Sequence, residues 1–121
     1  MSIKAPLMIL RLCWLLAIIM GIALWTGHLF HLAPLHMAIG SIAVLALWVI
    51  ALQAKRLGVP GSLIWVGIVW GLVELIFGGA QVQILTGPMH WLTQVVHLLL
   101  GIGVIGLGEA LAGRAKRLTP N

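Results

Sequence analysis

The sequence predicts an all-α integral membrane protein, a single domain built as a bundle of four transmembrane helices. Hydrophobic residues make up 62% of its 121 residues and charged residues only 7%, whereas soluble domains carry roughly 25% charged residues. Seven Lys and Arg and two Glu are too few to cover a water-exposed surface, so the composition excludes a soluble fold. Four long apolar runs, each near the roughly 20 residues that cross a bilayer as a helix, set the number of spans.

The four spans are expected at residues 6–25, 36–54, 63–85 and 91–112. Each run is roughly two to three times as long as a usual strand, which favours helices over buried strands. With their loops, the spans account for residues 1–121 as a single domain and leave no room for an extramembrane domain. Turn-forming residues separate the spans: Thr26-Gly27, Ala33-Pro34, residues 58–62 and Thr86-Gly87-Pro88.

The basic residues predict the orientation of the bundle. With four spans, all seven lie at the same membrane face, and Lys- and Arg-rich loops stay in the cytoplasm. We therefore expect both termini in the cytoplasm, in a bacterial inner membrane, with the first span kept as an uncleaved anchor. Anionic lipid headgroups suit these residues, and no basic surface remains for nucleic acid. The seven are Lys4, Arg11, Lys55, Arg56, Arg114, Lys116 and Arg117.

The two halves of the chain are similar to each other. A shift of 61 residues places His36 on His97, Gly40 on Gly101 and residues 54–57 on 115–118, and seven of 22 ungapped positions are identical. Chance matches in an apolar sequence are the alternative explanation, but His, Gly and Lys-Arg agree in one register. We expect two tandem helix-pair repeats related by a pseudo-two-fold axis along the membrane normal.

The duplication pairs two histidines. His36 and His97 each precede a Lys-Arg pair by 19 residues, a distance of about 28 Å along a helix. Both are therefore expected near the outer edge of the hydrocarbon, where a two-fold axis would present them to each other. His97 begins the most apolar part of its span, where an ionisable residue is costly and usually functional.

Two opposed histidines inside a four-helix bundle suit a b-type haem, because its iron takes two neutral imidazoles and its porphyrin is a large apolar disc. Gly40 and Gly101 each follow a histidine by four residues, one turn along the same face. The missing side chain at each of these glycines would let the macrocycle approach the backbone. Trp14, Gly21 and His28 recur every seven residues on the first span, which makes His28 a further candidate contact. Glycines also permit close helix packing without a ligand.

Its four spans, intramembrane histidines and neighbouring glycines give the chain a resemblance to small four-helix membrane cytochromes b, loosely the cytochrome b561-like group. The resemblance covers the bundle and implies bis-histidine haem b and electron transfer, often with a quinone. From this resemblance, only His36 and His97 receive a role, as axial iron ligands. Two-haem members need a second histidine pair toward the other membrane face, which this sequence lacks, so we expect at most one haem, near the outer face. Its redox partner would be an outer-side quinol, superoxide or a periplasmic electron carrier.

Three other functions stay open, as does the question of an enzymatic reaction. Histidines 28, 31, 36, 90 and 97 could hold Cu or Zn through imidazole nitrogens, or could be ordinary interfacial side chains. The length and span number also resemble small multidrug carriers, which would make Glu74 the acid of a proton-coupled transporter, although such carriers place it in their first span. Finally, the chain could be a structural subunit of a larger membrane complex or a homo-oligomer.

Glu74 lies near the middle of the third span, where an ionised carboxylate is costly. We expect it to be protonated, paired or facing a polar cavity. It would act either as a catalytic group in a proton relay or as a structural hydrogen-bond partner. It shares one helical stripe with Gly67, Gly71, Gly78 and Gln81.

Other polar side chains are expected to tie the helices together. Arg11 and Glu109 lie at similar depths near the inner face, which predicts an ion pair between the first and fourth spans. Thr93 and Gln94 lie about one turn before His97 and would either accept a hydrogen bond from its imidazole N–H or cap the start of the fourth span. The tryptophans inside the spans, at positions 14, 48, 65 and 70, are expected to pack or to face lipid.

Overall fold

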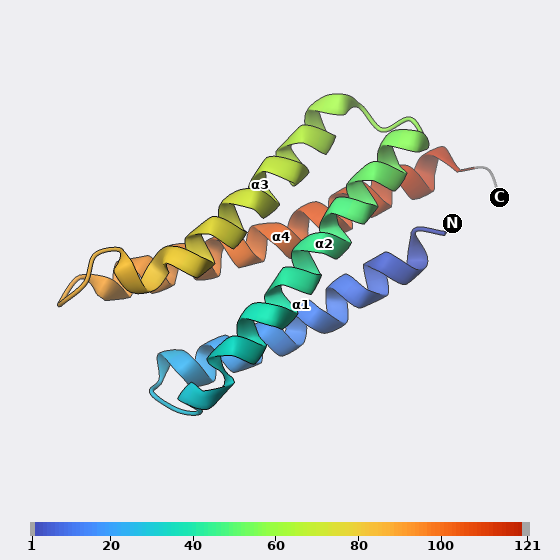
Figure 1. Cartoon of the computed structure of the whole chain (residues 1–121). Coiled ribbons are helices and arrows are strands. Elements are labelled where there is room, and N and C mark those ends of the chain that lie inside the picture. Colours follow the sequence, from blue (N-terminus) through green and yellow to red (C-terminus); the bar gives the residue numbers. More distant parts are fainter. Residues whose placement is uncertain (1, 120–121) are drawn as a thin grey trace.

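The computed structural model describes residues 2–119 and is helical along almost its whole length (Figure 1). Its four α-helices are α1 (Lys4–Trp25), α2 (Ala33–Arg56), α3 (Gly61–Ala80) and α4 (His90–Leu118). Two short 3₁₀ helices, η1 (Phe30–Leu32) and η2 (Gln81–Gln83), lie in the α1–α2 and α3–α4 connections. The described part contains no strand, so the all-α fold class is confirmed.

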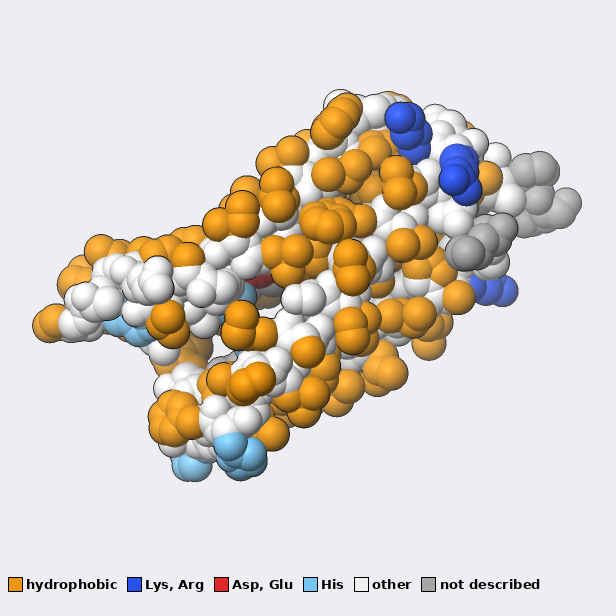
Figure 2. Space-filling model, viewed as in Figure 1, with side chains coloured by type: hydrophobic (Ala, Val, Ile, Leu, Met, Phe, Trp, Pro, Cys, Tyr) orange, Lys and Arg blue, Asp and Glu red, His pale blue; other side chains and the backbone are white. Residues whose placement is uncertain are grey.

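Each of the four α-helices is long and apolar enough to cross a membrane. Their lengths of 20 to 29 residues match a hydrocarbon core about 30 Å thick at 1.5 Å per residue. Large apolar side chains point outward along every helix, among them Leu12, Leu45, Trp65 and Leu99. Figure 2 shows this apolar surface over most of the molecule. Such a surface is stable in lipid and not in water.

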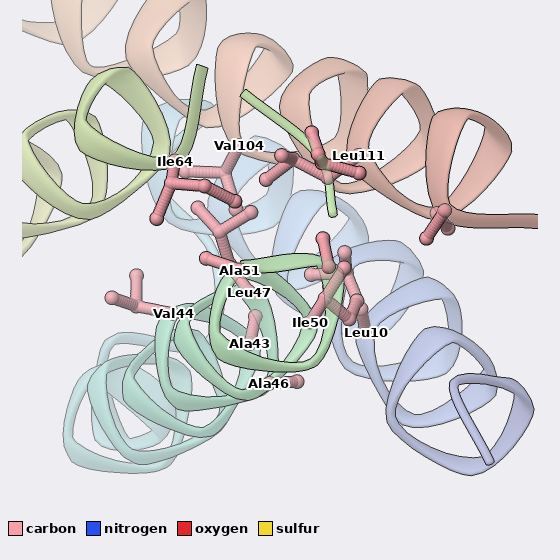
Figure 3. Close-up of a cluster of buried hydrophobic side chains, with 14 residues drawn as sticks. Leu10, Ala43, Val44, Ala46, Leu47, Ile50, Ala51, Ile64, Val104 and Leu111 are labelled. Atoms are coloured by element: carbon pink, nitrogen blue, oxygen red, sulfur yellow. The ribbon is translucent and has the colours of Figure 1, made fainter. Parts of the chain in front are cut away.

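Helices α2 and α4 form the centre of the bundle. They contact each other, and each also contacts α1 and α3, whereas α1 and α3 do not touch within the described chain. The tight core lies between the middle and C-terminal parts of α2 and α4 (Figure 3). Leu47, Ile50 and Leu111 are completely buried there, together with Leu10 from α1. Small residues, including Ala51 and Ala115, let the two central backbones approach closely.

Two helix ends differ from the expected spans by more than three residues. Helix α3 stops at Ala80 rather than at residue 85, because Gly78 and Gly79 are weak helix formers and the chain then turns through Gly87, whose φ is +95°. Helix α4 continues to Leu118, six residues beyond the expected end. Ala, Lys and Arg favour a helix in this segment, and Ala115 is buried against the core.

Both ends of the described chain lie at the same end of the bundle (Figure 1). The Lys and Arg side chains visible in Figure 2 also gather at this end, whereas the visible histidines lie toward the other. The α1–α2 and α3–α4 hairpins pack closely near the termini and diverge toward the histidine end. This divergence opens the space in which the candidate site lies.

Three intramembrane tryptophans hydrogen-bond between helices. The indole Nε1–H of Trp14 donates to the Gly101 carbonyl at 2.9 Å, that of Trp48 to Ile68 at 3.1 Å and that of Trp70 to Leu100 at 2.7 Å. Trp65 faces outward, as expected for a lipid-facing side chain. The bonds link α1 to α4, α2 to α3 and α3 to α4, so these tryptophans do more than fill space.

The ion pair predicted between the first and fourth spans is confirmed. Arg11 Nε lies 2.5 Å from Glu109 Oε1, and Arg11 Nη2 donates to Glu109 Oε2 at 2.9 Å. The contact is therefore bidentate, the geometry in which a guanidinium binds a carboxylate best. Both side chains are close to half exposed, so the pair lies at the outside of the bundle.

Candidate functional site

A cavity of about 450 Å³ lies between the two hairpins at the histidine end of the bundle. Its volume falls in the range of small-molecule sites, about 300–1,000 Å³. All four helices contribute to its mainly apolar wall, and Figure 2 shows the hollow between the diverging arms, with acidic and histidine atoms visible inside. Its polar side chains are few: Ser41, Glu74 and Gln81, with His36, His90, Gln94 and His97.

His36 from α2 and His97 from α4 meet in this cavity, as their equal depths predicted. Their ring centroids are 6.1 Å apart and their planes are nearly perpendicular, at 82°. Nδ1 of each ring is buried without a hydrogen-bond partner. The Nε2 atoms of the two rings are not among the buried atoms that lack a partner, and both rings line the cavity. Because His97 Nδ1 faces Glu74, the Nε2 atoms are the ring nitrogens that the pair can offer to whatever occupies the space.

Each ring rests against a glycine on the other helix of its own hairpin. A Cβ at Gly21 of α1 would lie 3.1 Å from His36 Cε1, and a Cβ at Gly78 of α3 would lie 3.0 Å from His97 Cε1. Both distances are shorter than ordinary van der Waals contact, so these glycines determine how deeply each ring can sit. The seven-residue spacing on the first span indicated Gly21, and the glycine stripe on the third span indicated Gly78. Neither pattern indicated which histidine each glycine would contact.

Gly40 and Gly101, the glycines expected to accommodate a macrocycle, both line the cavity but differ in surroundings. A Cβ at Gly40 would meet nothing within 4 Å, so this position faces open space. A Cβ at Gly101 would lie 3.2 Å from Glu74 Oε2. Gly101 thus makes room for a carboxylate of α3 as well as for the cavity.

Glu74 faces the cavity and is only 8% exposed. Its Oε1 lies 2.5 Å from His97 Nδ1, yet neither carboxylate oxygen has a hydrogen-bond partner of acceptable angle. The two groups are in contact while the ring N–H direction misses the oxygen. Glu74 is thus buried in contact with His97, without a formed hydrogen bond.

The remaining sequence candidates lie at the rim or outside the site. His28 is exposed, with Nδ1 3.2 Å from Thr26 Oγ1, and does not line the cavity. The hydroxyl of Thr93 donates to the Ile84 carbonyl at 3.1 Å rather than reaching His97. His90 Nδ1 lies 3.1 Å from the same carbonyl, so these two side chains attach the α3–α4 loop to α4.

No three His, Cys, Asp or Glu side chains of residues 2–119 come together as a group that could hold a metal ion. The Cu or Zn site considered from the sequence would require such a group. His31 is exposed, like His28, and the structure brings neither of them to His36 in the cavity. The histidine pair, rather than a histidine cluster, is the arrangement that the fold provides.

Neither a protein family, nor a curated protein, nor a solved structure matches this chain. The resemblance to small membrane cytochromes b therefore rests on its spans, histidines and glycines. Chemically, the site combines two imidazoles, one carboxyl group and an apolar space between them. Such a site can ligate one metal centre carried inside an apolar macrocycle, or can exchange a proton with a lipophilic guest.

Proposed function

We propose that this chain is a membrane haem b protein that transfers single electrons near the outer membrane face, with His36 and His97 as the two iron ligands. The haem would supply the one-electron chemistry. The protein would supply the two imidazoles and an apolar surrounding, which are among the features that set a haem potential. A quinol or a periplasmic electron carrier is the partner class that this location suits.

The separation of the two rings carries the proposal. An imidazole nitrogen bonded to a metal at roughly 2 Å places its ring centroid about 3 Å from that metal, so two opposed imidazoles have centroids about 6 Å apart. The observed value is 6.1 Å. Edge-to-face aromatic pairs cover about 4.5–7 Å as well, and the surroundings of the rings distinguish a ligand pair from a packing pair.

The surroundings of the pair favour ligation. A packing pair would have its nitrogens hydrogen-bonded, because buried polar groups without partners are costly. Here Nδ1 of His36 is buried without a partner, Nδ1 of His97 contacts Glu74 without a formed hydrogen bond, and both rings border a cavity of about 450 Å³. Gly40 faces open space in that cavity, which leaves backbone accessible to a flat apolar guest.

The topology supports a position of the histidine pair near the outer membrane face. We propose that both termini lie in the cytoplasm of a bacterial inner membrane, because the Lys and Arg side chains gather at the end where the termini lie. His36 and His97 would then lie toward the outer face. The contact pattern supports the tandem repeat, since α2 and α4 contact each other and each also contacts α1 and α3.

Absorption spectroscopy of the purified chain, produced with haem available, tests the proposal. We expect a reduced-minus-oxidised b-type spectrum that His36→Ala and His97→Ala each abolish, while His28→Ala and His31→Ala, which alter exposed histidines, retain it. The perpendicular ring planes also predict a strongly anisotropic low-spin ferric EPR signal, because each ring then interacts with a different iron d orbital. A colourless wild-type protein would contradict the proposal.

A pair of glycine variants tests whether the haem binds in the cavity. Gly40→Leu would project a side chain into the open space of the cavity, and we expect it to prevent haem uptake while the fold is kept. Gly106→Leu is the matched control, because Gly106 is exposed, has nothing within 4 Å of its Cβ and does not line the cavity. Equal haem content in the two variants would place the haem elsewhere.

A second function is favoured by one observation, the unpartnered Glu74 carboxyl group at the cavity wall. A buried acid beside an apolar cavity is what a small proton-coupled transporter requires. In that case Glu74→Gln would abolish proton-linked uptake into vesicles while His36→Ala and His97→Ala leave it intact. Loss of haem with either histidine variant, and no uptake in wild type, would decide for the electron-transfer function.

A further inference from the structure

We propose that Glu74 is a positioning residue for His97: its carboxylate accepts a hydrogen bond from Nδ1–H and so keeps Nε2 unprotonated and available to the cavity. Oε1 and Nδ1 are already 2.5 Å apart. The acid is 8% exposed, and the described chain gives neither atom another partner. An unsatisfied buried carboxyl is costly, so the two groups stabilise each other once the N–H turns onto the oxygen.

The surrounding helices hold both groups in this contact. Glu74 Oε2 rests against Gly101, and the His97 ring rests against Gly78. The carbonyl of Gly101 accepts the Trp14 indole N–H at 2.9 Å, which fixes that part of α4 against α1. Packing therefore limits the His97 ring to a narrow range of orientations beside the carboxylate.

The consequence is chemical as well as structural. A ligating histidine whose second nitrogen donates to a carboxylate has a fixed tautomer and is a more basic ligand, and loss of such a partner typically costs about 10- to 100-fold in metal affinity. A more basic imidazole stabilises ferric over ferrous iron. His36 has no carboxylate in contact with its Nδ1, so the two ligands would differ in electron donation.

The first experiment reads the tautomer without any haem. In ¹⁵N-histidine NMR spectra of the haem-free full chain in lipid nanodiscs, His97, assigned by its loss in His97→Ala, is expected as the Nδ1–H tautomer. Glu74→Gln should retain this tautomer, because its amide oxygen still accepts, whereas Glu74→Leu should lose it. An Nε2–H or doubly protonated His97 ring in the wild type would overturn the proposal.

The second experiment rests on the proposed function and uses the haem-loaded chain. We expect Glu74→Gln to raise the midpoint potential, since a neutral amide replaces the carboxylate. A tenfold change in the ratio of ferric to ferrous affinity corresponds to about 59 mV for one electron. Glu74→Leu should weaken haem binding about 10- to 100-fold.

Glu109→Gln is the matched control, because it removes the only other acid of the chain, and that acid pairs with Arg11 away from the cavity. Its potential should equal that of the wild type. An equal shift in Glu74→Gln and Glu109→Gln would overturn the positioning role. An Nδ1–H tautomer in a wild-type chain that takes up no haem would instead support the Glu74–His97 pairing and overturn the haem function.

Discussion

At the scale of single residues, the two imidazoles depend on glycines of neighbouring helices. Gly21 and Gly78 lie directly against the Cε1 atoms of His36 and His97, so the hairpin partner, not the histidine's own helix, sets the depth of each ring. The same principle applies to Glu74, which occupies the space left by the missing side chain of Gly101. Small residues here define positions for polar groups as well as close helix packing.

Alanine at these two contact positions should weaken haem binding. In Gly21→Ala or Gly78→Ala the new methyl group would lie 3.1 or 3.0 Å from the imidazole, and the ring must shift to relieve the contact. Overpacking of this kind costs about 1–3 kcal/mol, which corresponds to a roughly 5- to 150-fold loss of affinity. Titration of the haem-free chain with haemin measures the loss, and Gly106→Ala, with open space around it, should bind as the wild type does.

The ion pair of Arg11 and Glu109 leads to a separate prediction. Replacing Arg11 or Glu109 with a neutral residue of similar size should lower the thermal stability of the protein in detergent, because the remaining charge loses its bidentate partner. The double variant that combines Arg11→Glu with Glu109→Arg should restore most of the lost stability. The loss should be smaller than for Leu10→Ala, which empties a completely buried position at a cost of about 2–5 kcal/mol. No recovery in the exchanged variant would contradict a stabilising pair.

At the scale of helices, the tryptophans and glycines act together. Gly71 of α3 lies under the Trp48 indole, which donates to α3, and Gly103 of α4 lies so close to Trp70 that an added Cβ would overlap its ring. A glycine thus lets each indole reach a main-chain carbonyl on the facing helix. These contacts fix the spacing of α2, α3 and α4 beside the cavity.

Gly103→Ala should therefore disrupt the α3–α4 contact. The added methyl group displaces the Trp70 ring and its hydrogen bond of 2.7 Å, with an expected cost of about 1–3 kcal/mol. A lower unfolding temperature and a changed tryptophan fluorescence spectrum would report it. Gly106→Ala, one turn further along the same helix and free of contacts, provides the comparison, and identical behaviour of both variants would refute the proposed packing.

Much of the helical arrangement was predictable from the sequence. Hydropathy identifies the four spans, and equal distances to Lys-Arg predict that His36 and His97 meet. The early end of α3 at Ala80 depends on local turn geometry that a hydropathy window does not register. Likewise, the contacts of Gly21 and Gly78 depend on how each hairpin packs, and a helical stripe gives the face of a residue but not its neighbour.

The exclusion of His28 from the site has a similar physical reason. Seven-residue spacing places it on the face of Trp14 and Gly21 only while the helix continues, and α1 ends at Trp25. Three residues later the chain has turned through Gly27, whose φ is +87°, and His28 is exposed. The spacing rule fails at the helix end because its premise, a continuous helix, no longer holds.

At the scale of the whole molecule, the charge distribution predicts the orientation in the membrane. Fusions of a cytoplasm-active reporter and of an export-dependent reporter to each terminus should show activity only for the first. The reason is that Lys4, Arg56 and Arg117 lie at or near the membrane face shared by the termini. Activity of the export-dependent fusion at either end would contradict this orientation and would move the histidine site toward the cytoplasm.

Gly101 shows how closely the bundle and the site are interdependent. Its carbonyl oxygen accepts the indole of Trp14 from α1, and its bare α-carbon borders the carboxylate of Glu74 from α3. Three of the four helices thus converge on one residue that has no side chain. A methyl group added there would lie 3.2 Å from Glu74 Oε2, so the carboxylate would have to shift, and its contact with the neighbouring imidazole would shift with it.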